Sequence, residues 1–188
     1  MNKKFTVLGI IVAIIVLIGG YFFLTYNEMV SLNEKIDAKY SDIDTQLQRR
    51  ADLIPNLVNS VKGYMKHEQD AIDKVTDART KLVNAKDVTE KANADSELTK
   101  ALNNLIVIAE AYPNLKADST YVTLMDELAG TENRIATSRK DYNDAVEKYN
   151  SYIKRMPNSL IARMFNFSER AYFKAAEGAD AVPQVSFE

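Results

Sequence analysis

The chain has 188 residues, 46% of them hydrophobic, which is enough for one domain with a packed core. Its 24 basic and 26 acidic residues give a mildly acidic balance, which excludes the basic surface that nucleic-acid binding requires. Cysteine is absent, which excludes disulfides, thiol catalysis and cysteine-ligated metals, so packing must stabilise the fold.

The first predicted element is a membrane anchor. Residues 5–24 read FTVLGIIVAIIVLIGGYFFL and contain no charged residue. As a helix this segment is about 30 Å long, the thickness of a hydrocarbon core. A cleaved signal peptide is the alternative, but Tyr21-Phe22-Phe23-Leu24 prolongs the apolar run past the small residues Gly19-Gly20. We therefore predict a transmembrane helix over residues 5–25.

The flanking charges bear on orientation in the cell (inner) membrane. Lys3 and Lys4 precede the apolar run, and basic residues favour the cytoplasmic side. We therefore expect a single-pass protein whose bundle lies on the outer, periplasmic side. Lys35 and Lys39 follow the run at short distance, so a bundle on the cytoplasmic side is the alternative.

Apolar residues then recur three and four apart, the pattern of amphipathic helices. One stripe runs from Met29 to Leu82, longer than a usual globular helix. Pro55 interrupts it, and a proline removes one backbone donor from a helix, so we expect a kink or break there. A second stripe runs from Ala94 to Tyr112. The third has heptad spacing from Tyr121 to Met156, which predicts coiled-coil-like packing.

These patterns predict an all-α fold: an up-and-down bundle of three to four long helices behind one N-terminal transmembrane helix. The predicted order is an N-terminal flank (1–4), the transmembrane helix (5–25), a bundle (27–178) and a C-terminal tail (179–188). The bundle helices are expected at about 28–85, kinked near Pro55, and at 88–111, 118–155 and 158–177.

Polar residues occupy positions where the stripes should be apolar. Five charged residues fall on or near the seams: Arg50, Glu68, Arg79, Glu132 and Arg139. Buried charges need partners because desolvation costs several kcal/mol, so pairs such as Glu132 with Arg50 or Arg79, or Glu68 with Arg139, are expected. This polar seam is either a ligand site or a set of ion pairs that fixes helix register.

Catalytic and metal motifs are not found. The single histidine, His67, lies next to Glu68, and position 64 is tyrosine, so even one Glu-x-x-His motif of a di-iron bundle is missing. Zinc sites need several histidines or cysteines, and no phosphate loop or nucleophile elbow is present. We predict no cofactor, no metal, no catalytic residue and no enzyme activity.

Motifs along nearly the whole chain resemble the LemA family of bacterial membrane proteins. The matching segments are Tyr26-Asn27, Gln46–Arg50, Asp52–Val58, Val61–Tyr64, His67-Glu68, Ala111–Ala117, Thr131–Ala136, Tyr142–Val146, Tyr149-Asn150, Met156-Pro157 and Val182–Phe187. Two positions depart from the family pattern: Met156 stands where phenylalanine is common, and Ala51 where an aromatic residue is common. The resemblance implies a membrane-anchored, up-and-down helical bundle and supplies no reaction.

We therefore expect a non-enzymatic interaction or scaffold protein that contacts lipid through its anchor and binds an unidentified protein partner. The alternative is a small-ligand sensor or enzyme that uses the polar seam. A candidate docking segment follows Pro157 and consists of Leu160, Ile161, Met164, Phe165 and Phe167. Packing of this segment on the end of the bundle is the other interpretation. The sequence specifies neither the oligomeric state nor the biological process.

Overall fold

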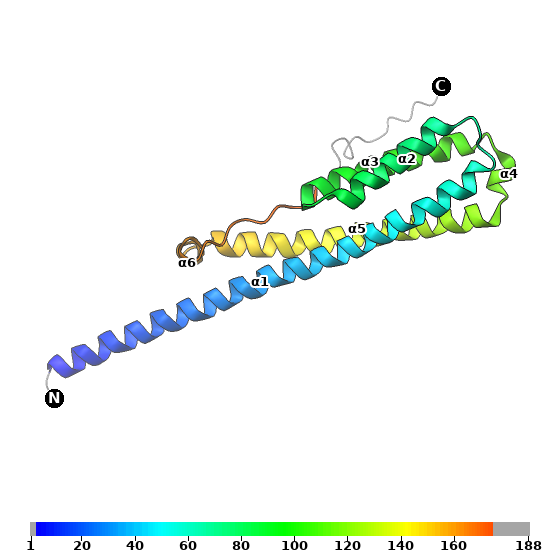
Figure 1. The fold of residues 1–188 in the computed structure, drawn as a ribbon. Coiled ribbons are helices and arrows are strands. Elements are labelled where there is room, and N and C mark those ends of the chain that lie inside the picture. The colour runs from blue at the N-terminus through cyan, green and yellow to red at the C-terminus, as the bar shows by residue number, and fades with distance from the viewer. Residues whose placement is uncertain (1–2, 175–188) are drawn as a thin grey trace, which may run out of the picture. The chain divides into compact units, whose positions relative to one another are not determined.

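A computed structural model describes residues 3–174. These residues form helices α1 (Lys3–Lys62), α2 (Gln69–Asn84), α3 (Val88–Ala109), α4 (Pro113–Lys116), α5 (Ser119–Lys154) and α6 (Asn158–Met164), and no strand occurs within this range (Figure 1). The predicted all-α class is confirmed. The chain divides into two compact units, to both of which α1 and α5 contribute.

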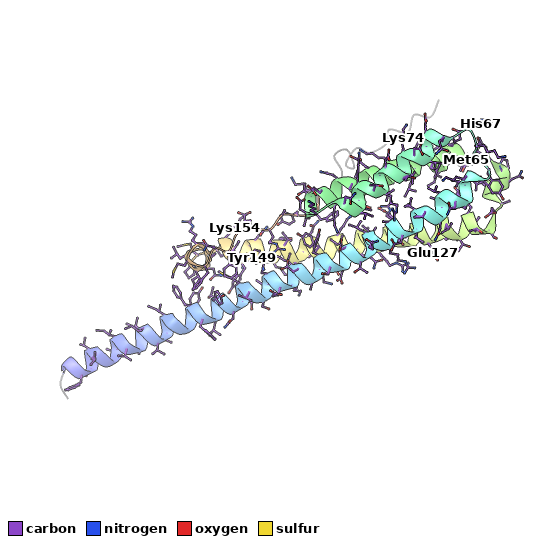
Figure 2. The ribbon with its side chains drawn as sticks, viewed as in Figure 1. Met65, His67, Lys74, Glu127, Tyr149 and Lys154 are labelled. Atoms are coloured by element: carbon purple, nitrogen blue, oxygen red, sulfur yellow. The ribbon has the colours of Figure 1, made fainter. Side chains whose placement is uncertain are left out.

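The first unit contains residues 1–39 and 143–170, of which 3–39 and 143–170 are described. The apolar residues of α1 from Phe5 to Ile18 are exposed, which is expected of a helix surrounded by lipid and costly for one surrounded by water. This helix is long and apolar enough to span a membrane, so it fits a membrane anchor. Beyond it, Met29 and Ile36 of α1 are fully buried, as is Tyr149 of α5 (Figure 2).

The end of the first unit is held by side-chain bonds to the backbone. Buried Asn150 donates through Nδ2 to the Arg170 carbonyl and accepts from the Arg170 amide, both at 2.9 Å. The Arg170 guanidinium donates to Asn33 at 3.1 Å and pairs with Asp37. The amide and carbonyl of Arg170, in an irregular segment, are thereby satisfied without a strand or helix.

The second unit contains residues 40–142 and 171–188, of which 40–142 and 171–174 are described. Here α2, α3 and parts of α1 and α5 pack their apolar stripes together. Buried core residues include Ile43, Leu47, Leu57, Ile72, Val75, Leu98, Leu105, Leu128 and Ile135. Burial of such side chains contributes about 1.5–3 kcal/mol each.

Helix starts follow local capping chemistry. Asp87 precedes α3, and its carboxylate accepts from the Glu90 amide at 2.8 Å. Asp118 precedes α5 and accepts from the Thr120 and Tyr121 amides at 2.9 and 3.0 Å. These bonds stabilise the charged form, so the pKa of Asp118 is lowered, chiefly by the Tyr121 amide.

The expectation of one helix over 28–85, kinked near Pro55, is wrong in its bounds, because α1 ends at Lys62 and a separate helix, α2, begins at Gln69. Pro55 lies inside α1, which is helical from residue 3 to residue 62. The interruption comes later, at residues 63–68, where Gly63 lowers helix propensity and buried Met65 closes the turn. The helices expected at 88–111 and 118–155 lie within two residues of α3 and α5.

The last predicted helix, 158–177, is also corrected. Helix α6 ends at Met164, and Asn166 adopts a left-handed conformation with φ of 58°. The Phe167 amide then donates to the Ala162 carbonyl at 2.9 Å and the Asn166 amide to Arg163 at 3.4 Å, which is a Schellman motif. Residues 167–174 are not helical, and residues 175–177 and the predicted tail 179–188 lie outside the described residues.

Candidate functional site

Three of the five polar-seam residues meet around Asp95 in the second unit. Arg50 Nη1 lies 2.6 Å from Asp95 Oδ1 and 2.6 Å from Glu132 Oε2. Arg139 pairs with the other oxygen of Asp95. The expected pairing of Glu132 with Arg50 is therefore present. We call Arg50, Asp95, Glu132 and Arg139 the buried ion cluster.

The buried ion cluster has two positive and two negative side chains, so its formal charges balance. The Asp95 side chain is fully buried and that of Arg50 is 5% exposed. Burial lowers the pKa of Arg50, and burial together with the nearby Arg50 charge lowers the pKa of Arg139 to about 10. The Arg139 guanidinium also lies 4.9 Å from the ring centroid of Phe173, a cation–π distance.

Arg79 has a different role, which involves Pro55. In a helix, the amide of residue 55 would donate to the carbonyl of Ala51, but proline has no amide proton. Arg79 Nε of α2 donates to that carbonyl at 2.8 Å. Arg79 therefore supplies the donor that Pro55 lacks, which explains how α1 continues through a proline.

Glu68 lies in the loop between α1 and α2, where its carboxylate accepts from the Tyr112 hydroxyl at 3.1 Å. Burial and this hydrogen bond raise the pKa of Tyr112. The expected pair of Glu68 with Arg139 is absent, because Arg139 pairs with Asp95. The neighbouring His67 is exposed (Figure 2).

The polar seam is therefore three separate arrangements. The buried ion cluster joins α1, α3 and α5, Arg79 joins α2 to α1, and Glu68 joins the loop before α2 to the loop between α3 and α4. In each arrangement charged groups contact protein groups, as in a register-fixing network, although Nε of Arg50 and Nε of Arg139 are buried without a hydrogen-bond partner among residues 3–174. Within residues 3–174, no group of three His, Asp or Glu residues is placed to hold a metal.

Sequence reasoning missed Asp95, the residue that both arginines contact. A signal was available: Asp95 lies three residues before Leu98 and three after Ala92, on the buried stripe of α3. A lone acid on an apolar stripe, in a chain whose other seams carry arginines, indicates a buried pair.

The candidate docking segment has two faces. Ile161 is buried, which corrects its place among the docking residues, while Leu160, Met164 and Phe165 are about half to two-thirds exposed. The segment contacts α1: Tyr21 Oη donates to Asn158 Oδ1 at 2.5 Å, and the Tyr26 ring lies 4.8 Å from that of Phe165.

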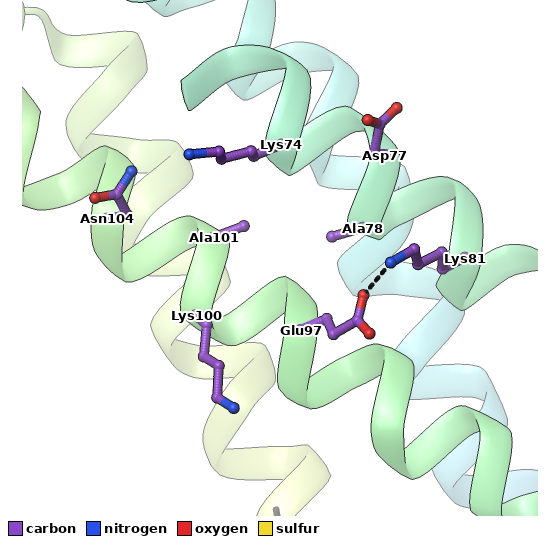
Figure 3. A pocket seen from close by; sticks show the side chains of 8 residues that line it. All are labelled: Lys74, Asp77, Ala78, Lys81, Glu97, Lys100, Ala101 and Asn104. Carbon is purple, nitrogen blue, oxygen red and sulfur yellow. Dashed lines mark hydrogen bonds and ion pairs between the residues drawn. The ribbon is translucent and has the colours of Figure 1, made fainter. Parts of the chain in front are cut away.

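Of the open grooves formed by residues 3–174, two lie one in each unit. One, in the second unit, is lined by Lys74, Asp77, Ala78, Lys81, Glu97, Lys100, Ala101 and Asn104 of α2 and α3, and Lys81 pairs there with Glu97 at 2.6 Å (Figure 3). The facing Ala78 and Ala101 allow the helices to approach, and the exposed ion pair adds little stability.

The groove in the first unit, which we call the juxtamembrane groove, has a volume of about 470 Å³. It is lined by Glu28, Leu32, Asp144, Glu147, Lys148, Ser151, Tyr152 and Arg155 of the first unit.

Comparison with known proteins decides the family. The LemA family model matches residues 39–187, about four-fifths of the chain. The chain belongs to the LemA family. The matched region includes the buried ion cluster, Pro55 and Arg79.

Other LemA-family relatives are similar at moderate identity. Magnetosome protein MamQ 2 of Paramagnetospirillum magneticum is 28% identical over 183 residues, which cover 84% of this chain and 67% of that protein. Magnetosome protein MamQ of Magnetospirillum gryphiswaldense is 26% identical over 191 residues, covering 86% and 70%. Protein LemA of Metamycoplasma hominis is 27% identical over 182 residues, covering 94% and 81%.

Proposed function

We propose that this LemA-family chain is a non-enzymatic interaction module, anchored in the membrane by Phe5–Leu24, that binds a second protein in its juxtamembrane groove. One observation carries the proposal: α1 continues from the apolar segment into the core of the first unit without a loop. Glu28, at the edge of the groove, lies four residues beyond Leu24, which is about 6 Å along the helix. The groove is thus held beside the bilayer surface.

The lining of the juxtamembrane groove fits a protein partner. Leu32 and Tyr152 provide half-buried apolar contact, while Glu28, Glu147 and Lys148 provide exposed charges of both signs. An apolar centre with a charged rim is the usual composition of a protein interface. We infer that the occupant is an amphipathic helix of another membrane-associated protein, with charges of both signs beside its apolar stripe.

The pairing in the bundle also favours this function over a ligand sensor or enzyme. A binding or catalytic site needs polar groups that are available to a ligand in a cavity. The arginines of the buried ion cluster instead contact Asp95 and Glu132. The relatives' names describe no reaction, and the MamQ names call those relatives magnetosome proteins.

The absence of cysteine makes the proposal directly testable. Glu28→Cys and Ser151→Cys place single thiols in the groove, and Val83→Cys on α2 is an exposed control in the other unit. After thiol-directed crosslinking in native membranes and mass spectrometry, both groove positions should yield the same protein, and Val83 should not. Adding Lys148→Glu should weaken this crosslink several-fold. Adducts at the groove no more frequent or specific than at Val83 would contradict the proposal.

We also propose that the groove lies on the outer side of the cell membrane, as Lys3 and Lys4 at the start of the span favour. Protease added to intact spheroplasts should degrade the body of the chain. Protection until the membrane is opened would place the body on the cytoplasmic side.

A further inference from the structure

We propose that α6 and the turn after it form an interfacial lipid-binding element, which inserts its exposed apolar face into the bilayer that holds the anchor. The partner is the membrane surface, which goes beyond the proposed protein-binding role of the juxtamembrane groove. We refer to Asn158–Phe167 as the interfacial segment.

The first argument is depth. An apolar pocket of about 350 Å³ is lined by Leu17, Ile18, Tyr21 and Phe22 of α1 and by Pro157, Leu160 and Ile161. Along α1, Leu17 lies about 10 Å before Leu24, the last residue of the apolar run. If residues 5–24 cross the hydrocarbon core, the side of α6 that lines this pocket with Leu17 and Ile18 reaches the level of the lipid chains.

Contacts of the interfacial segment with tyrosines at the end of the apolar run also place it at the membrane surface. The Tyr21 hydroxyl donates to Asn158 at 2.5 Å, and the Tyr26 ring lies 4.8 Å from Phe165 and 5.7 Å from Phe167. Tyrosines near the ends of a span lie characteristically at the headgroup level. The interfacial segment therefore lies beside the residues that mark the membrane surface.

The second argument is the two-faced character of the segment. Ile161 and Ala162 are buried against the protein, whereas Leu160, Met164 and Phe165 are 52%, 64% and 49% exposed. Exposed apolar groups of this size are unfavourable in water and stabilising at the headgroup–acyl boundary. At the depth given by its position beside α1, the interfacial segment lies at this boundary.

The third argument is charge. From Met156 to Phe167 the chain contains no acidic residue, and its single charged residue is Arg163. Arg163 is exposed, as is Arg155 just before the segment. Long basic side chains can extend from an apolar surface to lipid phosphates. The same composition is less suited to a protein partner, because Leu17 and Ile18 place the segment at a depth where lipid already surrounds the chain.

The test uses the full chain reconstituted in vesicles of phosphatidylcholine and phosphatidylglycerol. Met164→Cys carries an environment-sensitive fluorophore, and Leu160→Cys repeats the measurement at a second exposed position. Val107→Cys, on α3 in the other unit, is the matched exposed control. Helix content of each variant is checked by circular dichroism.

Lipids with a spin label near the headgroup should quench the fluorophore at both interfacial positions several-fold more than at Val107. A water-soluble quencher should show the reverse order. Equal quenching at Met164, Leu160 and Val107 would overturn the proposal. So would photo-crosslinking from Met164 in native membranes that yields a protein adduct in place of lipid adducts. Neither outcome affects the crosslinking test of the juxtamembrane groove, so the two proposals fail separately.

Discussion

The donor that Arg79 supplies to the Ala51 carbonyl predicts a measurable coupling between Arg79 and Pro55. Replacing Arg79 by methionine keeps much of the apolar stem but removes the bond at 2.8 Å. Ala51 is buried, so its carbonyl would lose its partner away from water. A hydrogen bond from a charged donor contributes about 1.5–3 kcal/mol, so Arg79→Met should lower the free energy of unfolding by about 2 kcal/mol.

The same change should cost less when residue 55 is alanine. In Pro55→Ala the new backbone amide can donate to the Ala51 carbonyl, as in an uninterrupted helix. Arg79→Met should then cost under about 1 kcal/mol, which leaves a coupling energy of about 1–1.5 kcal/mol. The cycle has four members: the wild type, both single variants and the double variant.

The assay is urea unfolding of the full chain in detergent micelles, followed by circular dichroism. Arg49→Met is the control, because Arg49 is exposed and lies 3.8 Å from exposed Glu127, a surface pair that contributes little. If Arg79→Met costs the same in the wild type and in the Pro55→Ala background, within about 0.5 kcal/mol, the reasoning is refuted.

Three further predictions concern burial, pH and insertion. Asp95→Asn should destabilise the chain by about 3–5 kcal/mol in the same urea assay, because it leaves buried arginine charges without their carboxylate. Tyr40→Phe should raise stability by about 1 kcal/mol, because the buried Tyr40 hydroxyl has no hydrogen-bond partner among residues 3–174. The stability of the Tyr40→Phe variant should also fall less steeply above pH 10 than that of the wild type. Ile14→Arg should lower the fraction of protein that resists alkaline extraction from membranes, because a central arginine costs about 3 kcal/mol of insertion free energy.

The sign of the pH effect follows from the tyrosine. Burial, and then the charges of Tyr142 and Asp87, raise the pKa of Tyr40 above 10. A raised pKa means that the folded state keeps its proton longer than the unfolded state. The associated stability is complete below pH 10 and is lost as the pH rises through the folded pKa. Phenylalanine removes this contribution.

For each of these three predictions, one experimental result would contradict it. A loss below about 1 kcal/mol in Asp95→Asn would mean that the buried ion cluster is hydrated or loosely paired. Parallel alkaline profiles of Tyr40→Phe and the wild type would show that Tyr40 titrates normally. Equal extraction of Ile14→Arg and the control Val107→Arg would argue against a membrane span.

The long helices could be predicted because their determinants are local. The heptad spacing of Tyr121, Leu128, Ile135 and Tyr142 requires one buried face, and all four side chains are buried in α5. The anchor could likewise be predicted from an uncharged run of spanning length. Period and length are properties that a single sequence displays directly.

Two of the corrections involve partners distant in the chain. Pro55 predicts a break only while no other donor reaches the Ala51 carbonyl, and Arg79 comes from another helix. The polar seam was predicted from residue types, but Asp95 decides which charges meet. The early end of α6 depends on Asn166 in the left-handed region, a conformation that asparagine tolerates and that its sequence position alone does not require.

The unbroken course of α1 fixes the rotation of the anchor about its own axis. Ile18, Phe22 and Thr25 continue, at spacings of three and four, the stripe that Met29 begins. Because no loop intervenes, inserting one residue after Leu24 would turn the anchor by about 100° and shift it by about 1.5 Å against the buried Met29. A neighbouring membrane helix would consequently meet one predetermined side of this anchor. Packing of the helices beyond the anchor therefore sets which side of the anchor helix faces a given direction in the bilayer, and contacts with lipid do not.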